Sequence, residues 1–218
     1  MRPRDGCWLD LSLPIQTHMP VYPGDPPVQI CRFLSHETDG IQASVLSMSC
    51  HAGTHIDAPR HYLKDGLSLE QLPVDRVAGT AYVAAAAWTV DGHIDLSAAD
   101  FSKRKPEDGL LLATGWDRKA GFPAYYESIP QFEKGSSRTL IEAGVSFFGL
   151  DMPTVVELKN PPDPAMMHRL LLGKGIVIIE SLFGLTPLIG KRIQFFAFPL
   201  LIPGCEASPV RACGYLLS

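Results

Sequence analysis

Apolar residues recur along the chain in short runs, and these runs predict a series of strands. Each run is rich in aliphatic or β-branched side chains, which is typical of strands. The run at 43–50 alternates in part between apolar and polar positions and leads the chain to His51. We predict strands over six ranges: 43–50, 80–90, 109–115, 145–151, 176–180 and 193–198.

Two segments between these strands carry the start and stop signals of helices. The first spans 137–143 and is followed by Gly144, a residue that favours the left-handed conformation just past a helix end. The second has Asp163 as its N-cap and Pro164 in its first turn, and Gly175 follows it. Strands that alternate with helices in this order predict an α/β fold with a mixed sheet.

The N-terminal region differs from the rest because prolines are frequent between Pro3 and Pro27. Proline fixes φ and removes a backbone donor, so we expect extended segments and turns here rather than helix. No linker-like stretch and no repeat divides the 218 residues, a length that suits one large domain. We therefore expect a single domain over 1–218.

Composition narrows the expected partners to small molecules. The net charge is -4 and the basic residues are scattered, so we expect no nucleic-acid partner. The apolar runs are far shorter than the roughly 20 residues that span a bilayer, so we expect no membrane role. Five cysteines without a CxxC pair favour reduced thiols in a cytoplasm. Among them, Cys50 could act as a ligand or nucleophile, but a packing role is the more common one.

The chemistry of the chain is concentrated in the run His51-Ala-Gly-Thr-His55-Ile-Asp57-Ala-Pro-Arg-His61, which holds three of the seven histidines. Imidazole nitrogens and carboxylate oxygens are the ligands that zinc and similar ions prefer. The run is not expected to be helical, because Gly53 weakens a helix and Pro59 favours extended chain before it. Solvated histidines in a polar loop are the simpler alternative, but such ligand density favours a metal site.

The expected backbone brings these side chains together. In extended chain, residues two apart share a face, which puts His55 and Asp57 on one side. A sharp turn at Gly53 would return His51 to the same point. Asp57 has two oxygens and could bridge two ions, and His61 lies further on and could stay free as an acid or base.

The run resembles the signature of the cyclase family, which includes bacterial kynurenine formamidase. The likeness continues in four further segments: Asp10-Leu-Ser12-x-Pro14-Ile, Tyr22-Pro-Gly-Asp25-Pro, Thr114-Gly-Trp116-Asp117 and Pro209-Val-Arg211-Ala. The resemblance implies a mixed-sheet α/β domain of the swivelling β/β/α type and a centre of one or two zinc or manganese ions. It also implies a homo-oligomer, either a homodimer or a homotetramer.

The resemblance also implies roles for individual residues. Five of them would be metal ligands: His51, His55, Asp57, His168 and Glu180. In this pattern Asp57 bridges the two ions and His61 acts as the catalytic proton shuttle. Taken alone, His168 would more often be a helix residue and Glu180 a strand-end carboxylate that faces solvent.

The implied activity is an arylformamidase-like hydrolysis of a small-molecule amide by metal-bound hydroxide. Kynurenine formamidases carry Trp where this chain has Tyr22, and that aromatic residue lies against the substrate. An isatin-type hydrolase of cyclic amides is therefore a competitor, although those enzymes tend to have Gln at the place of Glu180. A polyketide-type cyclase or dehydratase would use the same metal without consuming water. A non-catalytic protein would only bind metal or ligand on this scaffold, and Tyr22 could be a packing residue of a turn.

Overall fold

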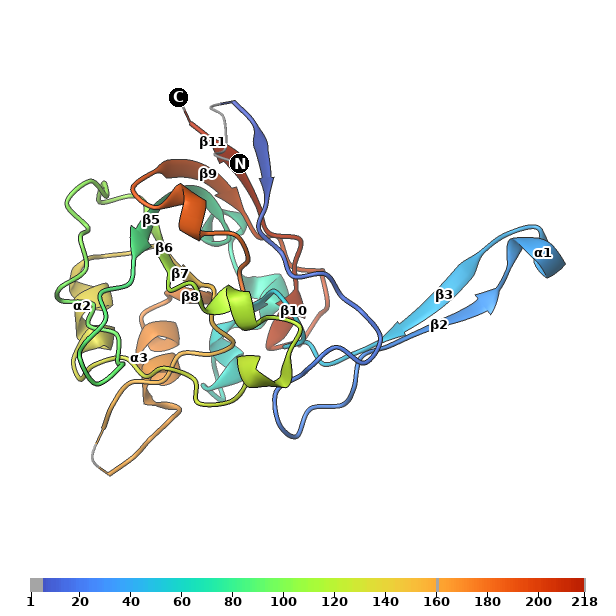
Figure 1. The fold of residues 1–218 in the computed structure, drawn as a ribbon, viewed down its shortest axis with the longest axis horizontal. Helices are drawn as coiled ribbons and strands as arrows, with labels where there is room; N and C mark the ends of the chain where they lie inside the picture. The colour runs from blue at the N-terminus through green and yellow to red at the C-terminus, as the bar shows by residue number, and fades with distance from the viewer. Residues whose placement is uncertain (1–5, 160, 218) are drawn as a thin grey trace.

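A nine-stranded mixed sheet runs through the protein, which is described by a computed structural model over residues 6–159 and 161–217 (Figure 1). The strand order is β1-β11-β9-β5-β6-β7-β8-β4-β10. The four central strands β5 to β8 are parallel to one another, and the remaining pairs are antiparallel. The strands of this sheet are β1 (Trp8–Asp10), β4 (His55–Asp57), β5 (Ala78–Ala85), β6 (Gly109–Ala113), β7 (Phe147–Leu150), β8 (Val177–Glu180), β9 (Arg192–Phe196), β10 (Ala207–Pro209) and β11 (Cys213–Leu216).

Each face of the sheet has its own hydrophobic core, because side chains alternate along every strand. On β6, Leu110 and Leu112 pack in the core that also holds Leu140 of helix α2 (Ser136–Glu142) and Leu171 of helix α3 (Met166–Gly173). Leu111 points to the opposite core, which is closed by loop residues. The fold is thus the mixed α/β type that the sequence predicts, with few helices and one helix-covered face.

All six predicted strands are present, but the second helix begins later than the sequence predicts. Helix α3 starts at Met166, and Asp163 is not its N-cap. The Asp163 carboxylate instead forms ion pairs with Lys159 and Arg169, so it is not free to accept from the first turn. Single-turn 3₁₀ helices join several elements: η1 (Pro59–His61), η2 (Leu69–Gln71), η3 (Val74–Arg76), η4 (Trp116–Lys119), η5 (Pro123–Tyr125) and η6 (Thr186–Leu188).

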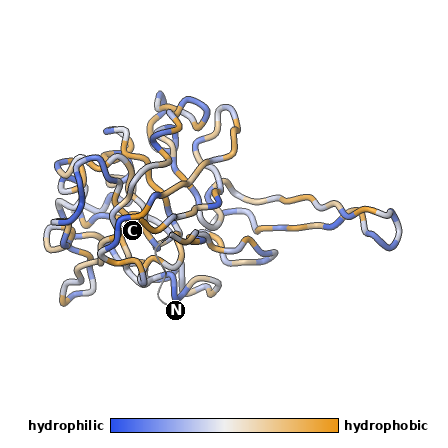
Figure 2. The backbone as a smooth tube through the Cα atoms, turned by 90° about the horizontal axis from the view of Figure 1, so that it is seen from above, coloured by the Kyte–Doolittle hydropathy of each residue, from blue (hydrophilic) through white to orange (hydrophobic). Residues whose placement is uncertain are grey.

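The predicted strand at 43–50 lies outside the main sheet. It is strand β3 (Ala43–Ser47), which pairs only with β2 (Gln29–Leu34) to form an antiparallel two-stranded ribbon. A short helix, α1 (His36–Asp39), lies at the tip. Residues 29–47, here named the arm, project far from the body of the protein (Figures 1 and 2). Among the described residues, no helix has the length and apolar character that a membrane span requires.

Candidate metal centre and pocket

The pairing of β4 with β8 builds the floor of the site. In this antiparallel pair His55 lies opposite Glu180 and Asp57 lies opposite Ile178. Because Ile56 points into the opposite core, His55 and Asp57 share the face that α3 covers. All three residues of β4 are buried, so the sequence has placed a histidine and a carboxylate where a core strand would carry apolar side chains.

A tight turn before β4 brings His51 back over the strand. Gly53 has φ +68, and a Cβ atom there would meet the Ile15 side chain at 2.6 Å. The positive φ favours glycine, and a larger residue would also have to displace the end of the Ile15 side chain. The next residue, Thr54, is held by its hydroxyl, which donates to the Ser181 carbonyl over 2.6 Å. His51 Nδ1 consequently lies 3.1 Å from Asp57 Oδ1.

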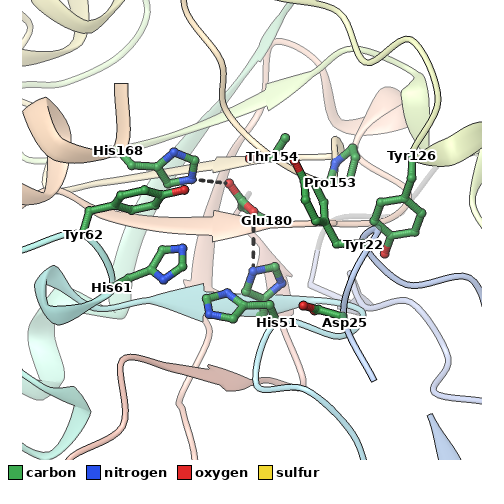
Figure 3. A pocket seen from close by; sticks show the side chains of 11 residues that line it. Tyr22, Asp25, His51, His61, Tyr62, Tyr126, Pro153, Thr154, His168 and Glu180 are labelled. Atoms are coloured by element: carbon green, nitrogen blue, oxygen red, sulfur yellow. Dashed lines mark hydrogen bonds and ion pairs between the residues drawn. The ribbon is translucent and has the colours of Figure 1, made fainter. Parts of the chain in front are cut away.

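Two further histidines approach from other elements. His61 ends η1, and its ring centroid lies 4.2 Å from that of His51. His168, on α3, places Nε2 3.2 Å from Glu180 Oε1 and 3.8 Å from Asp57 Oδ2. Figure 3 shows the side chains of His51, His61 and His168 pointing toward a common space beside Glu180. The structure therefore brings together every histidine and carboxylate that the sequence assigned to the site.

The ligand atoms form two groups that share Asp57. One group joins Asp57 to His51 and His61, and the other joins it to His55 and Glu180; within each group the atoms lie within 4.8 Å of one another. This grouping differs from the pattern that the family resemblance implies, in which His51 and His55 bind the same ion. It also places His61, which the resemblance makes the proton shuttle, in one group with His51 and Asp57.

The charge state of Asp57 provides the test of whether a cation fits. Its side chain is fully buried, and neither oxygen accepts a hydrogen bond of good geometry within residues 6–159 and 161–217. Burial alone would raise the pKa of the Asp57 carboxyl, but its contact with His51 and the charge of His55 outweigh burial and lower it. A buried carboxylate without hydrogen bonds costs several kcal/mol, so the site suits a divalent cation.

The pKa of His55 is also shifted by the negative charge of the nearby carboxylates. Burial would lower the pKa of its imidazole, but the Glu180 carboxylate, 3.5 Å from Nε2, and Asp57 raise the pKa to about 9. His55 Nδ1 lies 2.9 Å from the Gly53 carbonyl oxygen, so a neutral ring donates there and turns the Nε2 lone pair toward the carboxylates. This is the orientation that a metal-binding histidine needs.

A pocket of about 160 Å³ opens beside the centre. One wall is formed by the cluster of histidines with Glu180, and three tyrosines also line the pocket: Tyr22, Tyr62 and Tyr126. The Tyr22 ring, 47% exposed, meets the Tyr126 ring edge-on at 6.2 Å (Figure 3). Burial raises the pKa of Tyr62, and burial with the charges of Glu180 and Asp25 raises that of Tyr126 to about 12. Both hydroxyls therefore remain protonated donors at neutral pH.

The far wall of the pocket comes from the loop after β7, through Pro153 and Thr154. The loop is fixed by Asp151, whose carboxylate accepts from the backbone N–H groups of Thr114 and Gly115. Burial, opposed in part by these bonds, raises the pKa of Asp151 to about 6. The structure thus uses Asp151 to anchor a wall and not to contact a ligand.

Trp116 and Asp117, from a segment of the family likeness, and the candidate Cys50 have supporting positions. Trp116 and Asp117 are not among the residues that line this pocket: Trp116 Nε1 donates to the Tyr125 carbonyl, and Asp117 accepts from the Gly184 N–H. Cys50 does not line the pocket either, and burial raises the pKa of its thiol, which disfavours a reactive thiolate.

Sequence reasoning missed Tyr62, Tyr126 and Asp25 as pocket residues. Tyr62 directly follows His61, and its ring stacks at 4.6 Å on the ring of His168. Its place next to His61 could have predicted it, because a residue adjacent in sequence to a site residue lies near the site. Tyr126 carries no such signal, since the loop that holds it is far from the histidines in sequence.

Comparison with known proteins identifies the family. The Cyclase family model matches residues 9–155. The chain belongs to this family. It is similar to the kynurenine formamidase of Geobacillus thermodenitrificans, with 33% identity over 94% of this chain and 95% of that protein. It is also similar to the kynurenine formamidase of Salinibacter ruber, with 32% identity over the same shares of the two chains.

Solved structures show the same fold in this Cyclase-family chain. Isatin hydrolase A from Labrenzia aggregata, bound to benzyl benzoate, matches with a TM-score of 0.80 at 24% identity, over 97% of this chain and 94% of that chain. Isatin hydrolase A from Ralstonia solanacearum matches with a TM-score of 0.78 at 20% identity, over 97% and 92% of the two chains. The resemblance found in the sequence is confirmed, and with it the mixed α/β fold.

Proposed function

We propose that this Cyclase-family protein is a metal-dependent amidohydrolase that cleaves a small aryl amide, in the manner of an arylformamidase. The observation that carries the proposal is the position of Asp57. Its buried carboxylate has no hydrogen-bond partner within residues 6–159 and 161–217 and belongs to two groups of side chains that could hold a metal ion. The tyrosine-lined pocket beside it suits an aromatic substrate. Full-length similarity to kynurenine formamidases supports the amide as the bond that is cleaved.

Five residues would hold the metal, with Asp57 between the two groups: His51, His55, Asp57, His168 and Glu180. One or two zinc or manganese ions suit this set, which mixes imidazole nitrogen with carboxylate oxygen. When bound, the metal acts as a Lewis acid and lowers the pKa of a water towards about 7. The Nε2 atom of His168 lies 3.2 Å from Glu180 Oε1, so this nitrogen is the one turned toward the carboxylates.

His61 is the proton carrier in this proposal. Burial lowers the pKa of His61 below its ordinary value, and the nearby Asp57 carboxylate only partly opposes this shift. The ring is therefore neutral at pH 7 and can accept a proton from the attacking water. It then returns that proton to the departing nitrogen, a role that typically contributes about 10²–10⁴-fold to the rate.

The tyrosines would bind and orient the substrate. The hydroxyls of Tyr62 and Tyr126 are donors at neutral pH because their pKa values are raised. Both line the pocket, so they can donate to a carbonyl oxygen of the substrate. Tyr22 lies at the exposed rim, where its ring offers a face to an aryl group.

An isatin-type cyclic-amide hydrolase is the second candidate. Tyr22 in place of the formamidase Trp and the likeness to the fold of isatin hydrolase A support it. Glu180, which lies in the ligand cluster, supports the formamidase instead. A polyketide-type cyclase or dehydratase and a non-catalytic binding protein remain alternatives on the same scaffold.

Turnover on a panel of amides tests the proposal. Purified protein of known metal content is assayed with formanilide, N-formylkynurenine and isatin. The masses of the products are measured by mass spectrometry. Amide hydrolysis adds one water to the substrate, whereas cyclisation by dehydration removes one. A metal-loaded protein that turns over none of these amides would contradict the amidohydrolase assignment.

Three further properties belong to the same proposal. The chain forms one metal-dependent hydrolase domain over 1–218, because the strands of the main sheet come from both ends of the sequence. It works in the cytoplasm, as five cysteines without a disulfide among the described residues suggest. It assembles as a homodimer or homotetramer.

A further inference from the structure

Asp25 is a pocket carboxylate that the proposed metal site does not use. Two of the described residues that line the pocket carry a carboxylate, Asp25 and Glu180. Glu180 belongs to the ligand cluster, whereas Asp25 is in neither of its two groups. Asp25 is half-buried, and its carboxylate takes part in none of the ion pairs formed within residues 6–159 and 161–217. A charged group of a bound ligand can therefore pair with it.

A tight turn carries Asp25 to the pocket together with Tyr22. The Asp25 N–H donates to the Tyr22 carbonyl over 3.0 Å and closes the turn. Pro23 is the second residue of the turn and Gly24, with φ +100, is the third, which is the residue pattern of a type II β-turn. The backbone thus holds Tyr22 and Asp25 close together, and both residues line the pocket.

Asp25 lies on the side of the pocket away from His61. Figure 3 shows it on the same side as Tyr22 and Tyr126, with His61 on the opposite side. The charge of Asp25 acts on this part of the pocket, since burial together with the charges of Glu180 and Asp25 raises the pKa of Tyr126 to about 12. One end of the pocket thus combines a carboxylate with two aromatic rings, apart from the proposed proton carrier.

The pocket offers no basic side chain to an anionic substrate, because no lysine or arginine is among the described residues that line it. Arg169, which follows His168 on α3, pairs with Asp163 and does not line the pocket. A carboxylate of a substrate placed at this end would be repelled by Asp25. A neutral side chain that covered Asp25 would bury an unpaired charge, which costs free energy. An ammonium group avoids both costs.

We infer that Asp25, together with the rings of Tyr22 and Tyr126, binds an ammonium group of the substrate. The preferred substrate is then an aryl amide whose side chain carries an amine and no carboxylate. At pH 7 such an amine is protonated. Asp25 forms an ion pair with it, and the π-faces of the two rings attract the same charge. The inference rests on the proposed function for the aryl amide, but the ammonium site itself is tested by binding alone.

Three formanilides test the charge preference. They are identical except that a side chain on the ring ends in a primary amine, a methyl group or a carboxylate. The metal-loaded wild type should have a kcat/KM about tenfold higher for the amine compound than for the methyl compound, since an ion pair with aromatic contacts contributes about that much. The value for the carboxylate compound should be lower than that for the methyl compound. Equal values for the three, or the highest value for the carboxylate compound, would overturn the inference.

The variant Asp25→Asn isolates the role of the charge, because the amide has nearly the shape of the carboxylate. The ratio of the amine to the methyl kcat/KM should fall by about tenfold, and Asp25→Lys should favour the carboxylate compound. Asp91→Asn is the matched control, since it removes one negative charge at an exposed residue that does not line the pocket. Its ratio should equal that of the wild type. If Asp25→Asn lowers all three kcat/KM values by the same factor, Asp25 is a structural residue of the turn and the inference is wrong.

Titration calorimetry with the corresponding anilines, which have no amide bond, separates this inference from the proposed hydrolysis. The amine-ended aniline should bind the wild type and Asp91→Asn about tenfold more tightly than the methyl-ended aniline, and Asp25→Asn should lose this difference. If that result is found and no formanilide is hydrolysed, the proposed function is wrong and the ammonium site stands. Anilines that bind without regard to charge, or that do not bind, refute the ammonium site even where all three formanilides are hydrolysed.

Discussion

His55 and Glu180 face each other across the β4–β8 pair, with His55 Nε2 3.5 Å from Glu180 Oε2. They are separated by more than half of the sequence, yet the register of two short strands sets their separation. A slip of β4 by one residue would turn the His55 side chain to the opposite face of the sheet, away from Glu180. The metal centre therefore depends on strand register as much as on ligand identity.

Asp57→Ala should remove most of the bound metal, because Asp57 belongs to both ligand groups. We expect the affinity for zinc to fall by more than about 100-fold, since loss of even an outer partner of a ligand costs about 10–100-fold. Elemental analysis of purified protein measures this directly. Asp100→Ala, a change at an exposed carboxylate, is the control. Equal metal in wild type and Asp57→Ala would show that the centre is elsewhere.

His61→Ala should keep its metal and lose about 10²–10⁴-fold in kcat, the range typical of a lost acid–base group. Metal content and turnover are measured on the same preparation. The geometry makes this a demanding test, since His61 lies in one group with His51 and Asp57. Loss of the metal together with the activity would make His61 a ligand.

Tyr22→Trp should raise kcat/KM for N-formylkynurenine relative to a small formamide. A larger aromatic face at the rim of the pocket is expected to contribute about 0.5–1.5 kcal/mol, which corresponds to at most about tenfold. Phe122→Trp enlarges an aromatic residue that is 64% exposed and does not line the pocket, so it serves as control. If the ratio of the two kcat/KM values stays the same in Tyr22→Trp, the ring is a packing residue.

The melting temperatures of the metal-loaded and metal-free protein should move apart from pH 6 to pH 9. In the metal-free protein the pKa of His55 is raised from 6.5 to about 9, so its stabilising contribution is complete below 6.5 and is lost as the pH rises through 9. Metal binding changes in the opposite direction, because it needs the neutral imidazole. Thermal melts at fixed free zinc measure the gap, and a gap that narrows with pH would contradict the assignment of His55.

Arg192→Ala should destabilise the fold strongly, because it leaves the buried Asp108 carboxylate without its main partner. Two guanidinium nitrogens of Arg192 donate to Asp108 over 2.7 Å each, and the Asp108 side chain is fully buried. Removal of one partner of such a pair costs about 3–5 kcal/mol. The same bidentate geometry occurs between Arg211 and Asp10, which are exposed, so Arg211→Ala should cost at most about 1 kcal/mol. Urea unfolding of both variants checks the difference, and equal costs would refute the argument.

The sequence predicted the central strands because each is an apolar run buried on both faces, as in 109–115 and 176–180. It predicted extended chain at His55 and Asp57 but did not assign β4 to the sheet, since a strand of His55, Ile56 and Asp57 has no apolar pattern. The apolar pattern is missing at the site itself, where polar side chains occupy buried positions of the strand. Nor could local sequence show that 43–50 leaves the sheet, because β3 has the composition of a strand that packs in a core.

The candidate cluster was predictable in part: the type and spacing of His51, His55 and Asp57 form one dense run, and the family resemblance added His168 and Glu180. Their division into two groups was not, because it depends on the turn at Gly53 and on how η1 lies against α3. The aromatic wall also depends on tertiary structure, since Tyr22 and Tyr126 meet only in the folded chain.

Because Asp57 belongs to both groups, a bound ion would cross-link segments that lie far apart in the sequence. An ion held by Asp57 and Glu180 closes a loop that contains β5, β6, β7 and both body helices. Closing so long a loop removes much of the freedom of the unfolded chain, as a disulfide does. The metal therefore stabilises the sheet in proportion to the logarithm of its free concentration. The supply of divalent metal would then set how much of the protein is folded, before any substrate is bound.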